Sequence, residues 1–223
     1  MKFNQHTTLQ GCHAPFSASQ SVWLRYTDDK AIMRYENRNR KLLGSELHDF
    51  VKAQISLCQK VTNQKQLVQN IATFIYAKYQ SLDNLKFGLS IIRDIKKLPK
   101  EVFETLKLYI NDAIGFGMDP EVVLFYSEKF FGTADAISFR NNILRIHDLK
   151  TGELAASMDQ LLVYVALFCL EYRVKLSDIA NIELRIYQNN EITIHNPAID
   201  EIGPIMDKII HLNKLLEKVD EEV

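Results

Sequence analysis

The chain has 223 residues, which suits one globular domain of ordinary size. Apolar residues make up 47% of it and charged residues 25%, values that exclude a disordered or collagen-like protein. The net charge of −1 excludes a strongly basic chain, so any surface that neutralises nucleic-acid phosphates must be local. Two basic runs, at 34–41 and 93–100, are candidates, although such runs are more often simply solvated surface.

The first half of the chain is predicted to be helical. Apolar residues recur at helical spacing from about Arg40 to Gln80, and a further helix is expected from Pro99 or Lys100 to Ile114. Strands are predicted at 122–131, 133–139 and 143–149, followed by a helix from about 157 to 172. A hairpin at 181–196 and an amphipathic helix from about 199 to 216 complete an α/β fold. We expect one domain over 1–223, with a mainly helical part at 1–117 and a catalytic core at 118–223.

Three cysteines, Cys12, Cys58 and Cys169, are widely spaced and form neither a disulfide framework nor a zinc-binding pattern. The N-terminus lacks the apolar stretch of a signal peptide, and no segment reaches the ~20 apolar residues that span a membrane. The sequence therefore predicts a cytoplasmic protein with no membrane partner.

The central hairpin carries the most informative polar residues. A two-residue turn at Asn141-Asn142 places Ile137 opposite Ile146 and Asp135 opposite Asp148. Because side chains alternate along a strand, Lys150 shares the face of Asp148. A longer turn would shift the register and send Asp135 to the other face.

Two directly opposed carboxylates repel each other, and a divalent cation would turn this repulsion into coordination. Lys150 could then position the attacking water or stabilise negative charge on a phosphate. The alternative is that Asp135 and Asp148 merely flank turns and that Lys150 is a surface lysine. An isolated Asp-x-Lys triplet favours that alternative, whereas the opposed second aspartate favours the metal site.

The residues of this hairpin also resemble a known family. The stretches GTADAI (132–137), IHDLKTG (146–152) and QLLVY (160–164) resemble the PD-(D/E)XK nuclease superfamily, in its RecB-like and lambda-exonuclease-like branch. This resemblance implies a restriction-endonuclease-like core with a central mixed sheet flanked by helices. It also implies a Mg²⁺ or Mn²⁺ site, with Asp135, Asp148 and the backbone carbonyl of Leu149 as ligands and Lys150 as the catalytic lysine.

Gln160 and Tyr164 lie one turn apart on the predicted helix after the hairpin. In the family that this stretch resembles, such a pair orients the site or touches the substrate phosphate, so both are candidate catalytic and nucleic-acid-binding residues. The alternative is that Tyr164 packs in the core and Gln160 caps the helix.

Upstream segments extend the resemblance. LLGSELHDF (42–50) resembles the family's Gly-x-x-x-His element, which makes His48 a further candidate metal ligand, although a lone histidine on a helix is often an ordinary surface or core residue. Glu128 matches a glutamate that precedes the GTAD motif in related sequences, and it either approaches the metal or faces solvent. Ser17 and Ser19 resemble an entry element that could bind a phosphate, and equally could cap a helix.

Some cofactors are not expected. Three cysteines without the family's spacing predict no iron–sulfur cluster, and the absence of a GxxxxGK[ST] loop predicts no nucleotide cofactor. The overall similarity also suggests a phage-encoded protein, which would work in the host cytoplasm.

The sequence therefore favours a metal-dependent DNA nuclease, most simply an exonuclease for phage recombination, replication or DNA processing. One alternative is a protein that keeps the nuclease fold but only binds nucleic acid or a host protein. Another is a structure-specific or RNA endonuclease that uses the same chemistry. Because the chain carries so little basic excess, we expect a homo-oligomer or a phage recombination or replication partner to help enclose the DNA.

Overall fold

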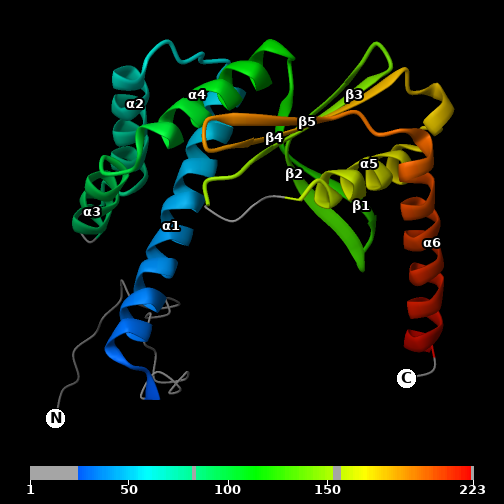
Figure 1. Cartoon of the computed structure of the whole chain (residues 1–223), viewed down its shortest axis with the longest axis horizontal. Coiled ribbons are helices and arrows are strands. Elements are labelled where there is room, and N and C mark those ends of the chain that lie inside the picture. The colour runs from blue at the N-terminus through cyan, green and yellow to red at the C-terminus, as the bar shows by residue number, and fades with distance from the viewer. Residues whose placement is uncertain (1–24, 82–83, 153–156, 222–223) are drawn as a thin grey trace. The chain divides into compact units, whose positions relative to one another are not determined.

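The computed structural model describes residues 25–81, 84–152 and 157–221 (Figure 1). The chain forms two compact units, which we call unit 1 (Met1–Phe50 and Val68–Leu98) and unit 2 (Val51–Leu67 and Pro99–Val223). Two of the three boundaries fall inside α1 (Asp28–Ser56) and α2 (Gln64–Lys78), and the third lies between Leu98 and Pro99. The sequence suggested a helical part at 1–117 and a core at 118–223. The two units are divided differently, because α4 (Lys100–Gly115) belongs to the same unit as the strands.

Unit 1 consists of helices, as the apolar periodicity predicted, and includes α3 (Leu85–Ile95). A buried carboxylate, that of Glu46, joins α1 to α2 by accepting hydrogen bonds from the Lys78 ammonium at 2.9 and 3.0 Å and from the Tyr79 hydroxyl at 2.6 Å. Gly88 of α3 lies against Tyr79 so closely that a Cβ at this position would come within 2.7 Å of the tyrosine Cβ. Only glycine fits there without a shift of the backbone.

Unit 2 is built on a five-stranded sheet in the order β1-β2-β3-β4-β5. The strands are β1 (Asp119–Ser127), β2 (Phe130–Arg140), β3 (Ile143–Leu149), β4 (Asn181–Gln188) and β5 (Glu191–His195). Only β3 and β4 run parallel, joined by α5 (Asp159–Tyr172) and a short 3₁₀ turn, Leu176–Asp178. After β5 the chain forms α6 (Ile199–Glu221). The expected α/β fold, a central mixed sheet flanked by helices with further helices before it, is confirmed.

Both hairpin turns predicted from Asn-Asn pairs are present. Asn141 and Asn142 have φ of 52° and 58°, and Asn189 and Asn190 have φ of 51° and 62°. Two successive left-handed residues give the turn whose twist matches that of paired strands, and asparagine tolerates this conformation better than most residues. These turns fix the registers of β2 with β3 and of β4 with β5.

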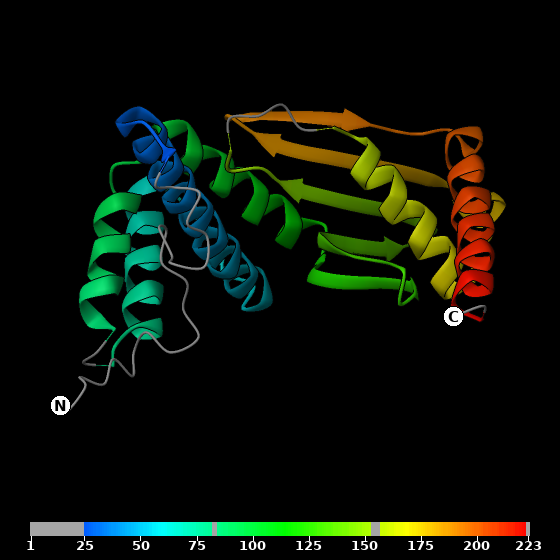
Figure 2. The ribbon, with the colours of Figure 1, turned by 90° about the horizontal axis from the view of Figure 1, so that it is seen from below.

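The two faces of the sheet have different partners. Leu144, Ile146 and their neighbours on one face form a hydrophobic core with α5 and α6, and Figure 2 shows α5 running across this face. On the opposite face, the ring of Tyr187 packs edge-on against Tyr109 of α4 at 5.2 Å between ring centroids. Strand β3 is thus covered on both faces, as expected for a strand with a parallel neighbour.

One predicted strand was wrong in its extent. The stretch 122–131 was expected as one strand, but β1 ends at Ser127 and the chain turns at Glu128 and Lys129 before β2 begins at Phe130. This turn contains no glycine, proline or asparagine, so the residue types that punctuate the sequence elsewhere give no signal here.

Candidate metal and catalytic site

A buried carboxylate and an ammonium group form an ion pair at the end of β3. The side chain of Asp148 is only 2% exposed and lies on the face covered by α5, as does Ile146 two residues earlier. The Lys150 ammonium donates a hydrogen bond to Asp148 Oδ1 at 3.0 Å and lies 2.9 Å from Oδ2. Asp148 Oδ2 has this ion-pair contact and accepts no hydrogen bond from any residue that the structure describes.

The position of Asp135 depends on the register of β2 with β3. The pairs Ile137–Ile146 and Ala136–His147 are formed as predicted, and Ala136–His147 is the last pair of this ladder. The ladder ends there, one step before the predicted pair of Asp135 and Asp148. Here the Asp135 carboxylate accepts a hydrogen bond from the backbone N–H of Leu149 at 2.9 Å. A side chain thus replaces the backbone acceptor where the ladder stops, and it ties the middle of β2 to the end of β3.

A third carboxylate, that of Glu121, was missed in the sequence. The register of β1 with β2 pairs Pro120 with Ala136 and Val122 with Ala134, so Glu121 stands opposite Asp135. A carboxylate oxygen of Glu121 lies within 4.8 Å of one of Asp135. Extending the register would have revealed it, but that required knowledge of the turn at Glu128 and Lys129.

The backbone is irregular at this row of carboxylates. Glu121 has φ of 54°, a left-handed conformation that is uncommon for glutamate. In β2, both Ala134 and Ile137 belong to the core beneath α5, although residues three apart in a regular strand face opposite sides. The alternation of β2 therefore breaks around Asp135. Residues held in such uncommon backbone conformations concentrate at functional sites.

The electrostatic environment of two tyrosines agrees with three converging carboxylates. Burial raises the pKa of Tyr109 well above its ordinary value, and carboxylate charges raise it further. These carboxylates, in order of their effect, are Asp135, Asp148 and Glu121. Burial also raises the pKa of Tyr164, on the opposite face of the sheet, and Asp135 and Asp148 contribute to this increase. The charges of Asp135 and Asp148 therefore affect a tyrosine on each face of the sheet.

Gln160 and Tyr164 extend the site along α5. The Lys150 ammonium donates to Gln160 Oε1 at 3.1 Å, and Gln160 Nε2 donates to the Tyr164 hydroxyl at 2.8 Å. Gln160 is exposed, whereas Tyr164 is part of the hydrophobic core. Tyr164 packs onto Gly132, where an added Cβ would come within 2.8 Å of the ring. The pair thus combines core packing by Tyr164 with a hydrogen-bonded chain that ends at Lys150.

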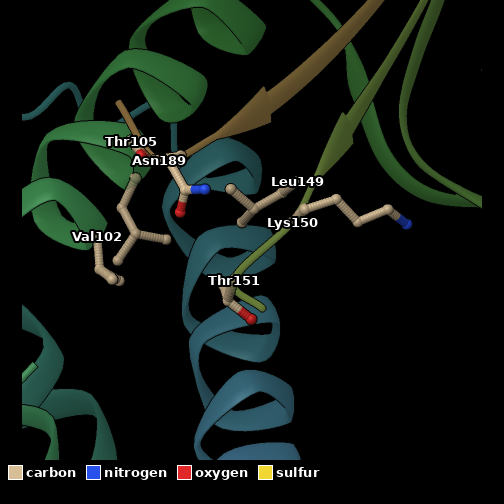
Figure 3. A pocket seen from close by; sticks show the side chains of 7 residues that line it. Val102, Thr105, Leu149, Lys150, Thr151 and Asn189 are labelled. Carbon is tan, nitrogen blue, oxygen red and sulfur yellow. The ribbon is translucent and has the colours of Figure 1, made fainter. Parts of the chain in front are cut away.

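The neighbouring strand β4 holds the backbone of Lys150. The Lys150 N–H donates to the carbonyl oxygen of Tyr187 at 2.9 Å, and the Tyr187 hydroxyl donates to Asp112 of α4 at 2.7 Å. Figure 3 shows Lys150 extending away from a small pocket lined by residues of α4, the end of β3 and the β4–β5 turn. The ammonium therefore lies apart from this pocket, and the candidate site is the row of carboxylates.

His147 precedes Asp148 and is completely buried on the face toward α4. Its Nδ1 lies 3.3 Å from the Tyr187 hydroxyl, and its Nε2 has no hydrogen-bond partner in the described part of the chain. Burial, followed by the charges of Arg185 and Arg145, lowers the pKa of His147 to about 3. The imidazole is therefore neutral at physiological pH, and it adds no positive charge beside the carboxylates.

The expected ligand Glu128 does not belong to this row of carboxylates. Glu128 is exposed in the turn before β2, and about 17 Å of strand separates Phe130 from Asp135, so the turn keeps Glu128 away from the carboxylates. His48 is half-buried on the part of α1 that belongs to unit 1. Ser17 and Ser19 lie outside the described residues.

The donor set suits a hard divalent cation. Carboxylate oxygens are the ligands that Mg²⁺ and Mn²⁺ take most readily, and one buried oxygen of Asp148 accepts no hydrogen bond from a described residue. Carboxylates close together are stabilised by positive charge, and the Lys150 ammonium supplies it to Asp148.

Comparisons with known proteins give one match. A family model described as "Protein of unknown function (DUF2800)" matches residues 122–219, a segment that contains Asp135, Asp148, Lys150, Gln160 and Tyr164. No curated protein matches the chain, and neither does any solved structure. Within the described residues, no helix combines the length and the apolar character needed to cross a membrane.

Proposed function

We propose that this protein is a metal-dependent nuclease that hydrolyses phosphodiester bonds in DNA. The observation that carries the proposal is the Lys150 ammonium hydrogen-bonded to the buried Asp148 carboxylate at the end of β3, where Asp135 from the middle of β2 accepts a hydrogen bond from the Leu149 N–H. A structural role alone would not require two further carboxylates beside that ion pair.

The residues divide the work as follows. Asp135, Asp148 and Glu121 would hold Mg²⁺ or Mn²⁺, with the Leu149 carbonyl as a further ligand that the family resemblance suggests. The cation, when bound, would stabilise negative charge that develops on the phosphate. Lys150 would donate a hydrogen bond to the attacking water or to a phosphate oxygen. Gln160 keeps the ammonium in place, and Tyr164 anchors Gln160 to the core.

The test is a digestion of end-labelled linear, nicked, circular and single-stranded DNA, and of RNA, with Mg²⁺, Mn²⁺ or Ca²⁺. We expect cleavage with Mg²⁺ or Mn²⁺ that is lost with EDTA and falls at least a hundredfold in Asp148→Asn and Lys150→Ala, because Asp148 would hold the cation and Lys150 would act on developing charge. Exposed residues of the same unit provide controls: Glu191→Gln on β5 should keep full activity.

The outcomes separate the alternatives. Cleavage of RNA in preference to DNA would assign the same chemistry to another substrate. Binding of DNA without cleavage under any metal would contradict the proposal and favour a protein that only recognises nucleic acid.

His48 stays a proposed further ligand on the basis of its sequence context. If it binds the metal, His48→Ala should raise the Mn²⁺ concentration needed for half-maximal cleavage more than His195→Ala does, since His195 pairs with Glu201 on the far edge of the sheet. Equal metal requirements in the two variants would remove His48 from the site.

A further inference from the structure

An exposed apolar strip lies on the β1–β2 hairpin. It consists of Val123 and Phe125 on β1 and of Phe131 on β2, with the exposed Thr133 opposite Val123. Val123 is 53% exposed, Phe125 45% and Phe131 60%. The rings of Phe125 and Phe131 lie 6.4 Å apart between centroids, and both remain open to solvent. Such a cluster of aromatic side chains at a surface usually marks a place where something binds.

The strip leads directly to the carboxylates. Phe125 pairs with Phe131 and Val123 with Thr133, and two residues further along the strands Glu121 and Asp135 lie between the pairs Val122–Ala134 and Pro120–Ala136. The alternate residues of both strands, such as Leu124 and Ala134, point to the core beneath α5, so the strip occupies the other face. Four residues of strand, or about 13 Å, separate the two phenylalanines from the carboxylate pair.

The edge of β1 argues against a peptide strand as the occupant. Strand β1 is an outer strand of the sheet, which a further strand could extend. However, the backbone N–H of Phe125 already donates to the Glu171 carboxylate of α5 at 2.7 Å. A strand added beside Phe125 would have to displace this charged acceptor, whereas a ligand that stacks on the rings would leave it in place.

Nucleic-acid bases fit the strip better than phosphates do. The net charge of −1 offers little general attraction for a phosphate backbone. Exposed aromatic rings bind unpaired bases by stacking, without sequence preference. A distance of about 13 Å corresponds to about four nucleotides at duplex spacing, and to fewer in an extended strand.

We propose that the strip binds the unpaired bases of a nucleic-acid strand whose phosphate, two to four nucleotides away, lies at the carboxylates. This inference rests on the proposed function and specifies its substrate: a single strand or a frayed end rather than an intact duplex. Phe125 and Phe131 are then binding residues, and they take no part in the chemistry.

Binding measured without cleavage tests the inference. In the Asp148→Asn background, fluorescence anisotropy with a labelled dT oligonucleotide should show a Kd about tenfold higher for Phe125→Ala and for Phe131→Ala, the effect of losing one base stack. Phe125→Tyr keeps a ring and should retain affinity. Ile194→Ala removes an equally exposed apolar side chain from β5, the opposite edge of the sheet, and should change the Kd less than twofold. Thermal unfolding of each variant confirms that it is folded.

Single abasic sites locate the contact. An abasic site two to four nucleotides from the scissile phosphate should weaken binding to the parent protein, and the same site should have no further effect on Phe131→Ala, because both changes remove the same stack. Unchanged affinity in both phenylalanine variants overturns the inference even when cleavage proceeds. Loss of self-association in these variants, with oligonucleotide binding intact, also overturns it and assigns the strip to a second copy of the chain. Stacking without cleavage by the parent chain refutes the proposed function alone.

Discussion

Replacing Lys150 with alanine should destabilise the protein before any substrate is added. The change leaves the Asp148 carboxylate, whose side chain is 2% exposed, without its ammonium partner. Removing one partner of a fully buried pair costs ~3–5 kcal/mol. Because the Lys150 side chain is 32% exposed, water screens the pair. We therefore expect the free energy of unfolding to fall by ~2–3 kcal/mol, less than for a fully buried pair. For a chain of this size the Tm should fall by roughly 4–12 °C.

Differential scanning fluorimetry of Lys150→Ala and the parent, with and without Mn²⁺, provides the measurement. A cation bound at the carboxylates replaces the missing charge, and at a hundredfold excess over its Kd it adds ~2.7 kcal/mol of stability. Mn²⁺ should therefore restore most of the lost Tm. Lys107→Ala breaks an ion pair with Glu104 in which both side chains are about a quarter exposed, so its Tm should fall less. A Tm of Lys150→Ala within 1 °C of the parent would refute the ion-pair argument, and a loss that Mn²⁺ leaves unchanged would refute the metal site.

Three further variants test the surroundings of the site. Gly132→Ala places a methyl group within 2.8 Å of the Tyr164 ring and should cost ~1–3 kcal/mol in unfolding free energy, a loss that Tyr164→Leu should partly relieve in the double variant. Gln160→Ala removes one hydrogen bond to Lys150, so cleavage should slow by about tenfold or more while the Tm stays within about 2 °C, since Gln160 is exposed. In the folded protein the pKa of His147 is lowered to about 3. As the pH falls from about 6.5 toward 3, His147 therefore takes up a proton in the unfolded chain but not in the folded one, which destabilises the fold. The parent should therefore lose ~1.4 kcal/mol more per pH unit over this range than His147→Gln, and parallel urea-denaturation curves between pH 7 and pH 4 would contradict this.

Much of the site followed from local turn chemistry. Asparagine tolerates positive φ, so Asn141 and Asn142 fixed a two-residue turn, and the turn fixed which residues of β2 and β3 face each other. From that register the positions of Asp135 and Asp148 could be counted along the strands. The same reasoning failed for β1, because no residue in the turn at Glu128 and Lys129 has a special conformational preference.

Other features depend on contacts between distant parts of the chain. The parallel pairing of β3 with β4 joins segments separated by α5, and no local pattern specifies it. The left-handed conformation of Glu121 in β1 is likewise invisible to sequence periodicity, which assumes a regular strand. The hydrogen bond from Lys150 to Gln160 likewise exists only because α5 packs across the sheet.

The hydrogen bond between the Lys150 N–H and the Tyr187 carbonyl has a consequence for folding order. Strands β2 and β3 can pair early because their turn is short, but Lys150 acquires its backbone partner only after the crossover through α5 has brought β4 alongside. Loop closure makes such non-local pairing slow. The amide hydrogen of Lys150 should therefore become protected from exchange later than those of the β2–β3 hairpin, so the candidate site would be among the last parts of unit 2 to form.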